Sequence, residues 1–399
     1  MTPTTASCDF AIFGGGIAGL MLLNQLRKQG FSVFLFEKDE LGKHQTSHSQ
    51  GIIHGGMKYA LTGTLNAETE AIAGMPKVWR QYLNGEGDVD LRGVQVLSET
   101  QYMWSTGNLA SRFSTFFASK LLRGRIDPLE REQFPSAFQS PKFKGVVYRL
   151  DDIVLDIPQV VQALIRHHET SLIQLREPES VQIIDADDGC AIRFADNGQY
   201  YEIRPQRIIF AAGAGNEVLL KKAGRATPQM QLRPLHMVAV KHRLPHQLCA
   251  HCIGTSPRPR ITITSHPAED GANVWYLGGE IAETGVERTK EEQILAAKAE
   301  LASLFPWLDF SAAEFATLRI DRAEPRQSNL LKPDTAFLQC DGAIWTAWPT
   351  KLTLAPSLCA QVMQCIQEQN IQHKVEQIPL PGVPVPAVAA PFWKTLFSH

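Results

Sequence analysis

The sequence predicts an α/β protein with a Rossmann-type dinucleotide-binding domain at its start and at least one further domain. Gly14, Gly16 and Gly19 give the spacing G-x-G-x-x-G between an apolar run and an amphipathic segment. Glu37 closes the next apolar run, 23 positions after Gly14. A chain of 399 residues also exceeds what a single hydrophobic core usually holds. The glycine motif therefore belongs to one domain of several.

The segment around the glycines reads as strand, turn, helix and strand. Phe10 to Phe13 form a short apolar run, and Ile17 to Gln29 show helical periodicity that ends at Gly30. Glycines at the turn allow close approach of the backbone to a pyrophosphate and tight packing of the helix on the sheet. An acid at Glu37 suits ribose hydroxyls and disfavours a 2′-phosphate, so at this point both FAD and NAD fit.

Composition excludes several classes of protein. Lys and Arg number 39 against 41 Asp and Glu, so the formal charge of -2 predicts no nucleic-acid partner. Seven scattered cysteines fit a reducing compartment, and we expect a cytoplasmic protein. The amino terminus lacks a basic region before its apolar run, and no run of about 18 apolar residues occurs. We therefore expect neither a signal peptide nor a spanning helix.

The flavin prediction comes from the stretch after Glu37, where a polar turn leads into "GIIHGGMKY". This stretch resembles FAD-dependent oxidoreductases of the D-amino-acid oxidase superfamily, in particular its glycerol-3-phosphate and 2-hydroxyglutarate dehydrogenase branches. In that family a Ser-rich turn and an "IHGG" or "IHAG" stretch run along the isoalloxazine ring. The resemblance implies FAD as the cofactor.

Further segments resemble the same family in the same order, from about Asp9 to about Gln367. They include "LDDIVLDIPQVVQALIRHH", "RIIFAAGAGNEVLL", "ATLRIDRAEP" and "WPTKLTLAPSLCAQVM". In the last, Lys351 and the next two residues stand where the family opens a helix against the flavin. Backbone amides and a cation there stabilise the negative charge of a reduced ring. Thr350 replaces the family's glycine, which puts the loop geometry in question.

The resemblance and the glycine motif together imply one set of FAD-binding residues. These are Gly14, Gly16, Ile17, Ala18, Gly19, Glu37, Lys38, Ser47, Ser49, Gln50, Gly51, Val181, Ala212, Gly213, Lys351, Leu352 and Thr353.

Removing hydride from a small anionic substrate needs a base and an anion-binding group. His54 is the predicted base, because histidine titrates near neutral pH and the two following glycines allow close approach of a ring. Arg319 and Arg322 are predicted for the anion, and Arg319 is preferred as the match to the family's arginine. Lys58 and Tyr276 are secondary candidates, each with a packing or rim role as the alternative.

A competing interpretation concerns "PLHMVAVKHRLPHQLCAHCIG", in which Cys249 and Cys252 have the spacing of metal ligands. No second pair of that kind follows, and "HMVAVKHRL" alternates like a strand. We therefore predict no metal site.

The resemblance implies a FAD-binding domain assembled from residues 1–80, 151–224 and 330–370. Residues 81–150 and 225–329 would form the interleaved substrate domain, an antiparallel sheet that roofs the flavin. The proline-rich tail, residues 371–399, would pack across the surface. Alternatively, Phe392, Trp393, Leu396 and Phe397 would make a peripheral membrane contact, at the inner face of the membrane, that suits electron delivery to quinone.

The predicted function is an FAD-dependent oxidoreductase that takes hydride from a 2-hydroxy acid or polyol phosphate, with reoxidation by oxygen or quinone. An amine or amino-acid oxidase or dehydrogenase is the alternative within the same fold. A dinucleotide-binding protein without redox turnover is the alternative outside it.

Overall fold

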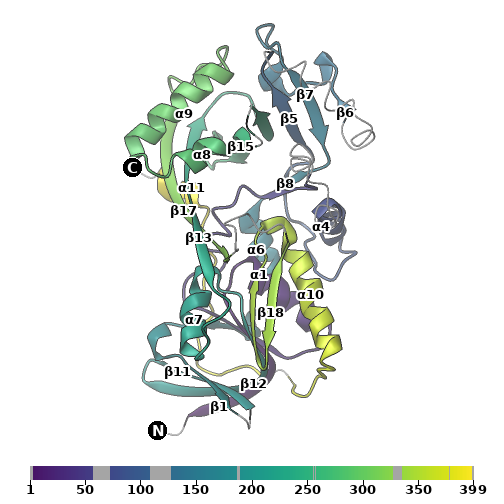
Figure 1. Cartoon of the computed structure of the whole chain (residues 1–399), viewed down its shortest axis with the longest axis vertical. Helices are drawn as coiled ribbons and strands as arrows, with labels where there is room; N and C mark the ends of the chain where they lie inside the picture. The colour runs from purple at the N-terminus through teal and green to yellow at the C-terminus, as the bar shows by residue number, and fades with distance from the viewer. Residues whose placement is uncertain are drawn as a thin grey trace.

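The computed structural model describes residues 3–56, 72–107, 127–186, 189–254, 256, 258–326, 335–376 and 378–397. The molecule is elongated, with two lobes stacked along its long axis (Figure 1). Two long strands, β13 (Met230–His242) and β17 (Glu314–Pro325), descend from the upper lobe towards the lower one.

The lower lobe is built on a sheet in the order β10-β11-β12-β1-β2-β9, with β19 beside β12 and β18 beside β19. The strands β12, β1, β2, β9 and β19 form its parallel part, whereas β10, β11 and β18 are joined antiparallel. The strand bounds are β1 (Thr4–Phe13), β2 (Val33–Glu37), β9 (Leu172–Gln174), β10 (Gln182–Ala186), β11 (Gly189–Asp196), β12 (Gln199–Phe210), β18 (Phe337–Asp341) and β19 (Ile344–Trp348). This parallel core confirms the Rossmann-type prediction.

Helices cover this sheet, and α1 (Ile17–Lys28) packs against α6 (Ile157–Ile165) and α10 (Ala355–Glu368). Leu20, Leu23 and Leu26 are fully buried on α1, as their spacing predicts. The remaining helices of this lobe are α4 (Met75–Asn84) and α7 (Asn216–Lys222), with short 3-10 turns η4 (Glu169–Ser171), η5 (Pro178–Ser180), η6 (Gly213–Gly215) and η7 (Leu352–Leu354).

The upper lobe is built on a second sheet in the order β17-β13-β16-β15-β14-β5-β7-β6. All its neighbours are antiparallel except β14 and β5. The further bounds are β5 (Gln101–Ser105), β6 (Asp127–Pro128), β7 (Val146–Leu150), β14 (Ala250–Ile253), β15 (Pro259–Pro267), β16 (Asn273–Gly278), η2 (Arg131–Gln133), η3 (Ser136–Phe138), α8 (Glu280–Thr284) and α9 (Lys290–Leu304). Because its strands come from chain segments between those of the first sheet, the interleaved fold class is confirmed.

The two faces of the second sheet have different neighbours. Trp275 and Leu277 point into a core with Ala297 and Leu301 of α9. Tyr276, one position along, points to the opposite face, which we call the roof face. Strand register places Met103, Tyr148, His251, Thr262, Thr264 and Met237 on the roof face.

A small third sheet lies between the lobes and connects them. It pairs β3 (Ile52–Ile53), β8 (Ile153–Leu155) and β4 (Val96–Ser98) in the order β3-β8-β4. The segment before His54 is therefore anchored as a strand at the junction of the two lobes.

The carboxyl-terminal tail packs on the protein and ends in α11 (Phe392–Leu396). Phe392 is 6% exposed and lies in a cluster with Tyr276 and Met237, against which Trp393, Leu396 and Phe397 also pack. Phe392 is therefore not available to a bilayer, whereas Trp393, Leu396 and Phe397 are partly exposed, so a membrane contact through these three stays a prediction. Within the described residues, no helix combines the length and apolar character needed to cross a membrane.

Asp9 fastens the start of this tail to β1. Its carboxylate is fully buried and accepts hydrogen bonds from the Ser32 and Lys374 amides, the Ser32 hydroxyl and Gln206, with His373 Nδ1 at 2.7 Å. Burial alone raises the pKa of Asp9, but these hydrogen bonds outweigh it and hold the pKa below its ordinary value.

Replacing Asp9 by alanine is expected to lower the free energy of unfolding by at least about 2 kcal/mol at neutral pH, because several hydrogen bonds to a charged acceptor are lost. A group with a lowered folded pKa stabilises above its unfolded pKa of about 4, and that contribution is lost as pH falls through the folded value. Denaturation of both proteins across this range checks the prediction. A difference that stays constant into acid would contradict it.

Candidate active site

The glycine turn between β1 and α1 leaves no room for side chains at two positions. Gly14 has φ +112°, and a Cβ there would lie 2.6 Å from the Ala211 carbonyl oxygen. A Cβ on Gly19 would lie 1.9 Å from the Gly14 carbonyl oxygen. Gly16 precedes the first residue of α1 and makes no side-chain cap. The turn therefore keeps the open amino end of α1 clear for an anion.

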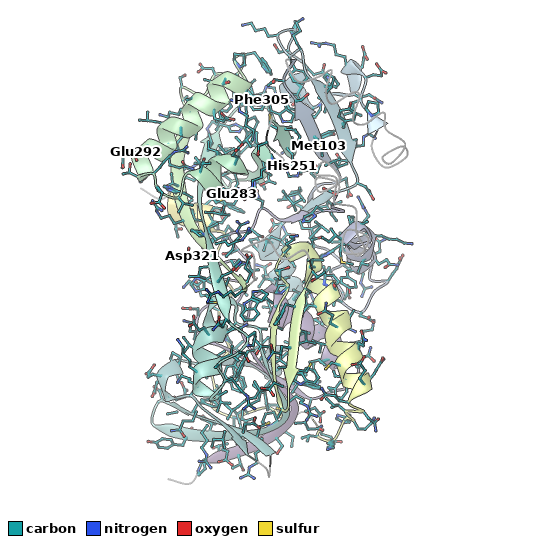
Figure 2. All side chains as sticks on the ribbon, in the orientation of Figure 1. Met103, His251, Glu283, Glu292, Phe305 and Asp321 are labelled. Atoms are coloured by element: carbon teal, nitrogen blue, oxygen red, sulfur yellow. The ribbon has the colours of Figure 1, made fainter. Side chains whose placement is uncertain are left out.

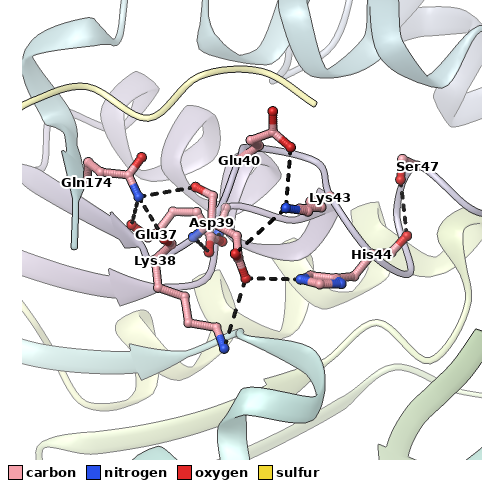
Figure 3. A network of polar contacts seen from close by, with 9 residues as sticks. Glu37, Lys38, Asp39, Glu40, Lys43, His44, Ser47 and Gln174 are labelled. Carbon is pink, nitrogen blue, oxygen red and sulfur yellow. Dashed lines mark hydrogen bonds and ion pairs between the residues drawn. The ribbon is translucent and has the colours of Figure 1, made fainter. Parts of the chain in front are cut away.

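Glu37 lies directly against this turn. One carboxylate oxygen accepts from the Gly15 amide at 2.6 Å and the other from the Asp39 amide at 2.8 Å. Lys38, in contrast, is exposed and lies 4.0 Å from Asp39. Figure 3 shows the surrounding network, in which Asp39 also meets His44 and Lys43. The hydrogen bond from His44 is the main reason that the pKa of Asp39 is lowered.

The polar turn after Glu37 connects the glycine turn to the upper lobe. Thr46 Oγ1 accepts from the Ile17 amide at 3.0 Å, and the Ser47 hydroxyl donates to the His44 carbonyl. Gln50 reaches up and donates to the Tyr276 carbonyl at 2.8 Å and to the Thr262 carbonyl at 3.2 Å. The turn therefore ties the start of α1 to strands β15 and β16 of the second sheet.

Ser49 and Gly51 complete this turn. In the part of the chain that the structure describes, the buried Ser49 hydroxyl has no hydrogen-bond partner. Gly51 has φ +72°, and a Cβ there would lie 2.3 Å from the Leu155 carbonyl oxygen. A buried hydroxyl without a partner is costly unless a ligand satisfies it.

His54 is 7% exposed, and the chain around it is held from both sides. Its carbonyl accepts from Thr353 Oγ1 at 3.2 Å, and the Gly55 amide donates to Asp152 Oδ1 at 2.7 Å. Trp79 Nε1 donates to the Thr353 carbonyl at 3.1 Å. Segments that are about three hundred residues apart in sequence meet here, so the His54 peptide has a fixed place.

Thr350 stands where the family has a glycine, and its backbone adopts the conformation that a glycine would favour. Thr350 has φ +61°, the left-handed conformation that a glycine at this position would adopt easily. Its hydroxyl donates to the Thr335 carbonyl at 2.9 Å, and the Lys351 amide donates to the Pro349 carbonyl. Leu352 and Thr353 then form η7, which leads straight into α10.

Ala212 and Gly213 lie at the end of β12, beside the glycine turn. The Ala212 amide donates to Asn216 Oδ1 at 2.7 Å, and Gly213 has φ +56° with its carbonyl bound by Trp348 Nε1. Val181 is buried in the neighbouring cluster, and its carbonyl accepts from Lys222. The carboxyl ends of β1, β2 and β12 thus meet at one edge, where α/β sheets bind nucleotides.

These residues fit an extended dinucleotide. The glycine turn is a cradle that a Cβ would fill, and Glu37 stands at its edge. The Ser49 hydroxyl, which has no partner among the described residues, lies further along. When bound, FAD supplies the hydride-accepting ring. The chain's own residues would hold the pyrophosphate at α1 and orient the ring near the His54 peptide.

The structure separates the two candidate arginines. Arg319 pairs across the sheet with His236, away from the roof face, and its guanidinium donates to the Val286 and Arg288 carbonyls at 2.6 and 2.7 Å. Arg322 shares its side of β17 with Ile320, which packs in the cluster of Tyr276 and Met237. The preference for Arg319 is therefore corrected, because its side chain binds the loop at Val286 and Arg288 on the face opposite the roof face.

Arg322 also lies next to the polar turn, since the Ala323 amide donates to Gln45 Oε1 at 3.1 Å. Glu283 of α8 is 4.0 Å from the Arg322 guanidinium. Figure 2 shows Glu283 near the junction of the lobes, with Met103 and His251 close together further inside the upper lobe. His251 Nδ1 is 2.9 Å from Thr262 Oγ1 on the roof face.

Tyr276 is corrected as a candidate for substrate contact. It is fully buried, its hydroxyl donates to the His48 carbonyl at 3.1 Å, and burial raises its pKa well above the ordinary value. Its role is therefore to hold the polar turn. Lys58 lies outside the described residues.

Cys249 directly precedes β14, and Cys252 lies within it. Because they are three positions apart, their side chains point to opposite faces of the sheet, and Cys252 lies in the core under α9. Burial raises the pKa of Cys249 to about 11 and that of Cys252 to about 12, so both thiols stay protonated. Among the described residues, no group of three metal-ligating side chains occurs.

Sequence reasoning missed Thr46, Asp152, Trp79 and Leu41. Thr46 lies in the polar segment after Glu37 and Asp152 in a segment that resembles the family, but only the fold shows that they bind backbone amides of the site. Trp79 and Leu41 carry no local signal, because each acts through contacts outside its own segment: Trp79 binds the Thr353 carbonyl, and Leu41 packs on Gly15 and pairs with the tail.

Comparison with known proteins agrees with this geometry. Residues 9–330 match the model of the DAO family, described as FAD dependent oxidoreductase. A probable FAD-dependent oxidoreductase of Pseudomonas aeruginosa is 47% identical over 397 residues, covering 99% of this chain and 100% of that protein. The crystal structure of an FAD dependent oxidoreductase from that organism covers 100% of both chains with a TM-score of 0.85 and 42% identity.

A more distant structure also shares the fold. L-α-glycerophosphate oxidase of Mycoplasma pneumoniae, solved with FAD bound, has a TM-score of 0.64 at 14% identity and covers 95% of this chain and 100% of that one. In sequence, a glycerol-3-phosphate dehydrogenase of Pseudomonas tolaasii is 39% identical over 71 residues, 18% of this chain and 14% of that protein.

Proposed function

Because the chain belongs to the DAO family of FAD-dependent oxidoreductases, we propose that it oxidises the hydroxyl-bearing carbon of a small anionic substrate, a 2-hydroxy acid or a polyol phosphate. The observation that carries this proposal is the fixed His54 peptide, held between Thr353 and Asp152. Short sequence matches to glycerol-3-phosphate and L-2-hydroxyglutarate dehydrogenases favour a hydroxyl over an amine.

Each residue has one task in this proposal. The His54 imidazole accepts the hydroxyl proton while hydride leaves the same carbon, so that the carbon becomes a carbonyl. Arg322 binds the carboxylate or phosphate of the substrate, because a guanidinium pairs with either anion through two parallel hydrogen bonds. The roof face excludes water from the reacting carbon. Oxygen or a quinone then takes the electrons.

Anaerobic addition of candidate substrates tests the proposal through bleaching of the visible flavin band. We expect 2-hydroxy acids or polyol phosphates to bleach it and the matching amino acids to leave it unchanged. Bleaching by amino acids alone would replace the proposal with amine oxidation. A flavin that no donor reduces would favour a protein without redox turnover.

Arg322→Ala is expected to raise KM for the anionic substrate by about 10- to 150-fold, the loss of about 1.5–3 kcal/mol for a hydrogen-bonded charge. Arg319→Ala is the matched control, since it removes the same group from the opposite face and should leave KM within about twofold. Steady-state kinetics and flavin content are measured for both. A larger effect on KM from Arg319→Ala would return the anion site to that residue.

A further inference from the structure

The tail of the chain forms a strap that runs past the dinucleotide site. We define the strap as residues 371–376 and 378–397. From Asp9 it passes the Tyr201 hydroxyl, which donates to the Pro381 carbonyl, and then the Gln174 amide, which donates to the Pro384 carbonyl at 2.8 Å. In Figure 3 a yellow segment crosses above Gln174 and Glu40. The strap therefore follows the edge at which β9 and β2 end.

The strap first fastens the glycine turn through Leu41. The Leu41 amide donates to the Ala387 carbonyl at 2.7 Å, and the Ala389 amide donates back to the Leu41 carbonyl at 3.0 Å. Leu41 is fully buried, and its Cδ2 is 2.4 Å from where a Cβ on Gly15 would stand. The Gly42 amide also donates to the Gly15 carbonyl. The strap thus fixes the residues that support the pyrophosphate turn.

The strap then places Phe392 between the lobes. The Phe392 ring centroid is 4.7 Å from that of Tyr276 and 5.5 Å from that of His48. Tyr276 itself donates to the His48 carbonyl. The ring centroid of the adjacent Trp393 is 4.9 Å from that of His266 in β15, with the two rings tilted by 37°. Phe392 therefore supports both partners of the bond that ties the polar turn to the roof face.

We infer that the strap is part of the FAD site and that Phe392 is a positioning residue for the cofactor. The polar turn from Leu41 to Gly51 carries Ser47, Ser49 and Gln50, and the strap holds it at both ends: by backbone pairing at Leu41 and by the Phe392 ring at His48. Without the ring, the turn loses its support and relaxes into the space left behind. FAD then binds to a turn that must first be ordered, which weakens binding.

The decisive variant is Phe392→Ala, with Phe392→Leu as the conservative change and Ile378→Ala as the control. Ile378 belongs to the same strap but is 66% exposed, so its truncation removes apolar surface without removing support. Apoprotein is prepared from each variant, and FAD affinity is measured by quenching of flavin fluorescence. We expect at least a tenfold rise in Kd for Phe392→Ala, a smaller rise for Phe392→Leu and none for Ile378→Ala.

Thermal unfolding of each protein with and without FAD distinguishes cofactor positioning by Phe392 from a purely structural role. If Phe392 positions the cofactor, the added Tm that FAD gives is reduced in Phe392→Ala, because that increment depends on Kd. An equal loss of Tm in apoprotein and holoprotein, with unchanged Kd, overturns the inference. Tyr276→Phe keeps the packed ring and removes only the hydroxyl that binds His48, so it reports on the same support if Phe392→Ala does not fold. An unchanged Kd in Tyr276→Phe would then overturn it.

Discussion

His54→Asn is expected to reduce kcat by about 10²- to 10⁴-fold while the protein still purifies with its flavin. The proposed base is the imidazole. Asparagine is also polar, but its side chain cannot accept a proton at neutral pH. The contact that fixes this segment uses the His54 carbonyl and Thr353 Oγ1, so it survives the change of side chain. Steady-state rates with the best substrate of the panel and the flavin-to-protein absorbance ratio are the measurements.

His167→Asn serves as the matched control. His167 is exposed and has φ +69°, a conformation that asparagine accepts more readily than most residues, so neither folding nor rate should change. Partial recovery of His54→Ala by added imidazole would further identify the missing proton acceptor. A His54→Asn protein with full kcat would remove the base from the mechanism, and one without flavin would give His54 a cofactor role instead.

The cofactor end of the site could be predicted from sequence because its demands are local. Gly14 and Gly19 are required by contacts within a few residues or with the adjacent strand, and Glu37 ends the very next strand. Such contacts leave a spacing that can be read along one segment. The helix from Ile17 ended within one residue of the predicted position for the same reason.

The substrate end could not be predicted in the same way, because it depends on which face of a strand a side chain occupies. Arg319 and Arg322 are three positions apart, so alternation places them on opposite faces, but the sequence does not say which face meets the flavin. Strand pairing decided this. Tyr276 looked like a polar residue near a substrate, and only its bond to the His48 carbonyl shows its packing role.

The tail shows a different limit. Its aromatic residues have the composition of a membrane-contacting segment, yet Phe392 is buried between Tyr276 of the upper lobe and His48 of the polar turn. The signal for that location is spread over three distant residues. The Asp9 carboxylate binds Lys374 and His373, the Gln174 amide binds the Pro384 carbonyl, and Leu41 pairs through its backbone with Ala387 and Ala389. Single contacts of long range leave no pattern in sequence, although together they determine the course of the chain.

Gly19→Ala is expected to raise the Kd for FAD at least about 100-fold, or about 2.7 kcal/mol. Two effects oppose each other at this position. Alanine favours a helix over glycine by about 1 kcal/mol, which would stabilise α1. Its Cβ, however, would lie 1.9 Å from the Gly14 carbonyl oxygen, and both atoms are fixed to backbone, so no rotamer relieves the overlap. The glycine turn must open, and the steric effect therefore outweighs helix propensity.

Gly74→Ala is the control that isolates the steric effect. Gly74 precedes α4 with φ −78°, and a Cβ there would meet nothing within 4 Å, so the same methyl group should leave FAD affinity unchanged. Fluorescence titration of both apoproteins measures Kd, and circular dichroism checks that each is folded. Equal affinities in the two variants would mean that α1 slides away from β1 without disturbing the turn. In that case the packing of Gly19 on Gly14 would not be what shapes the pyrophosphate site.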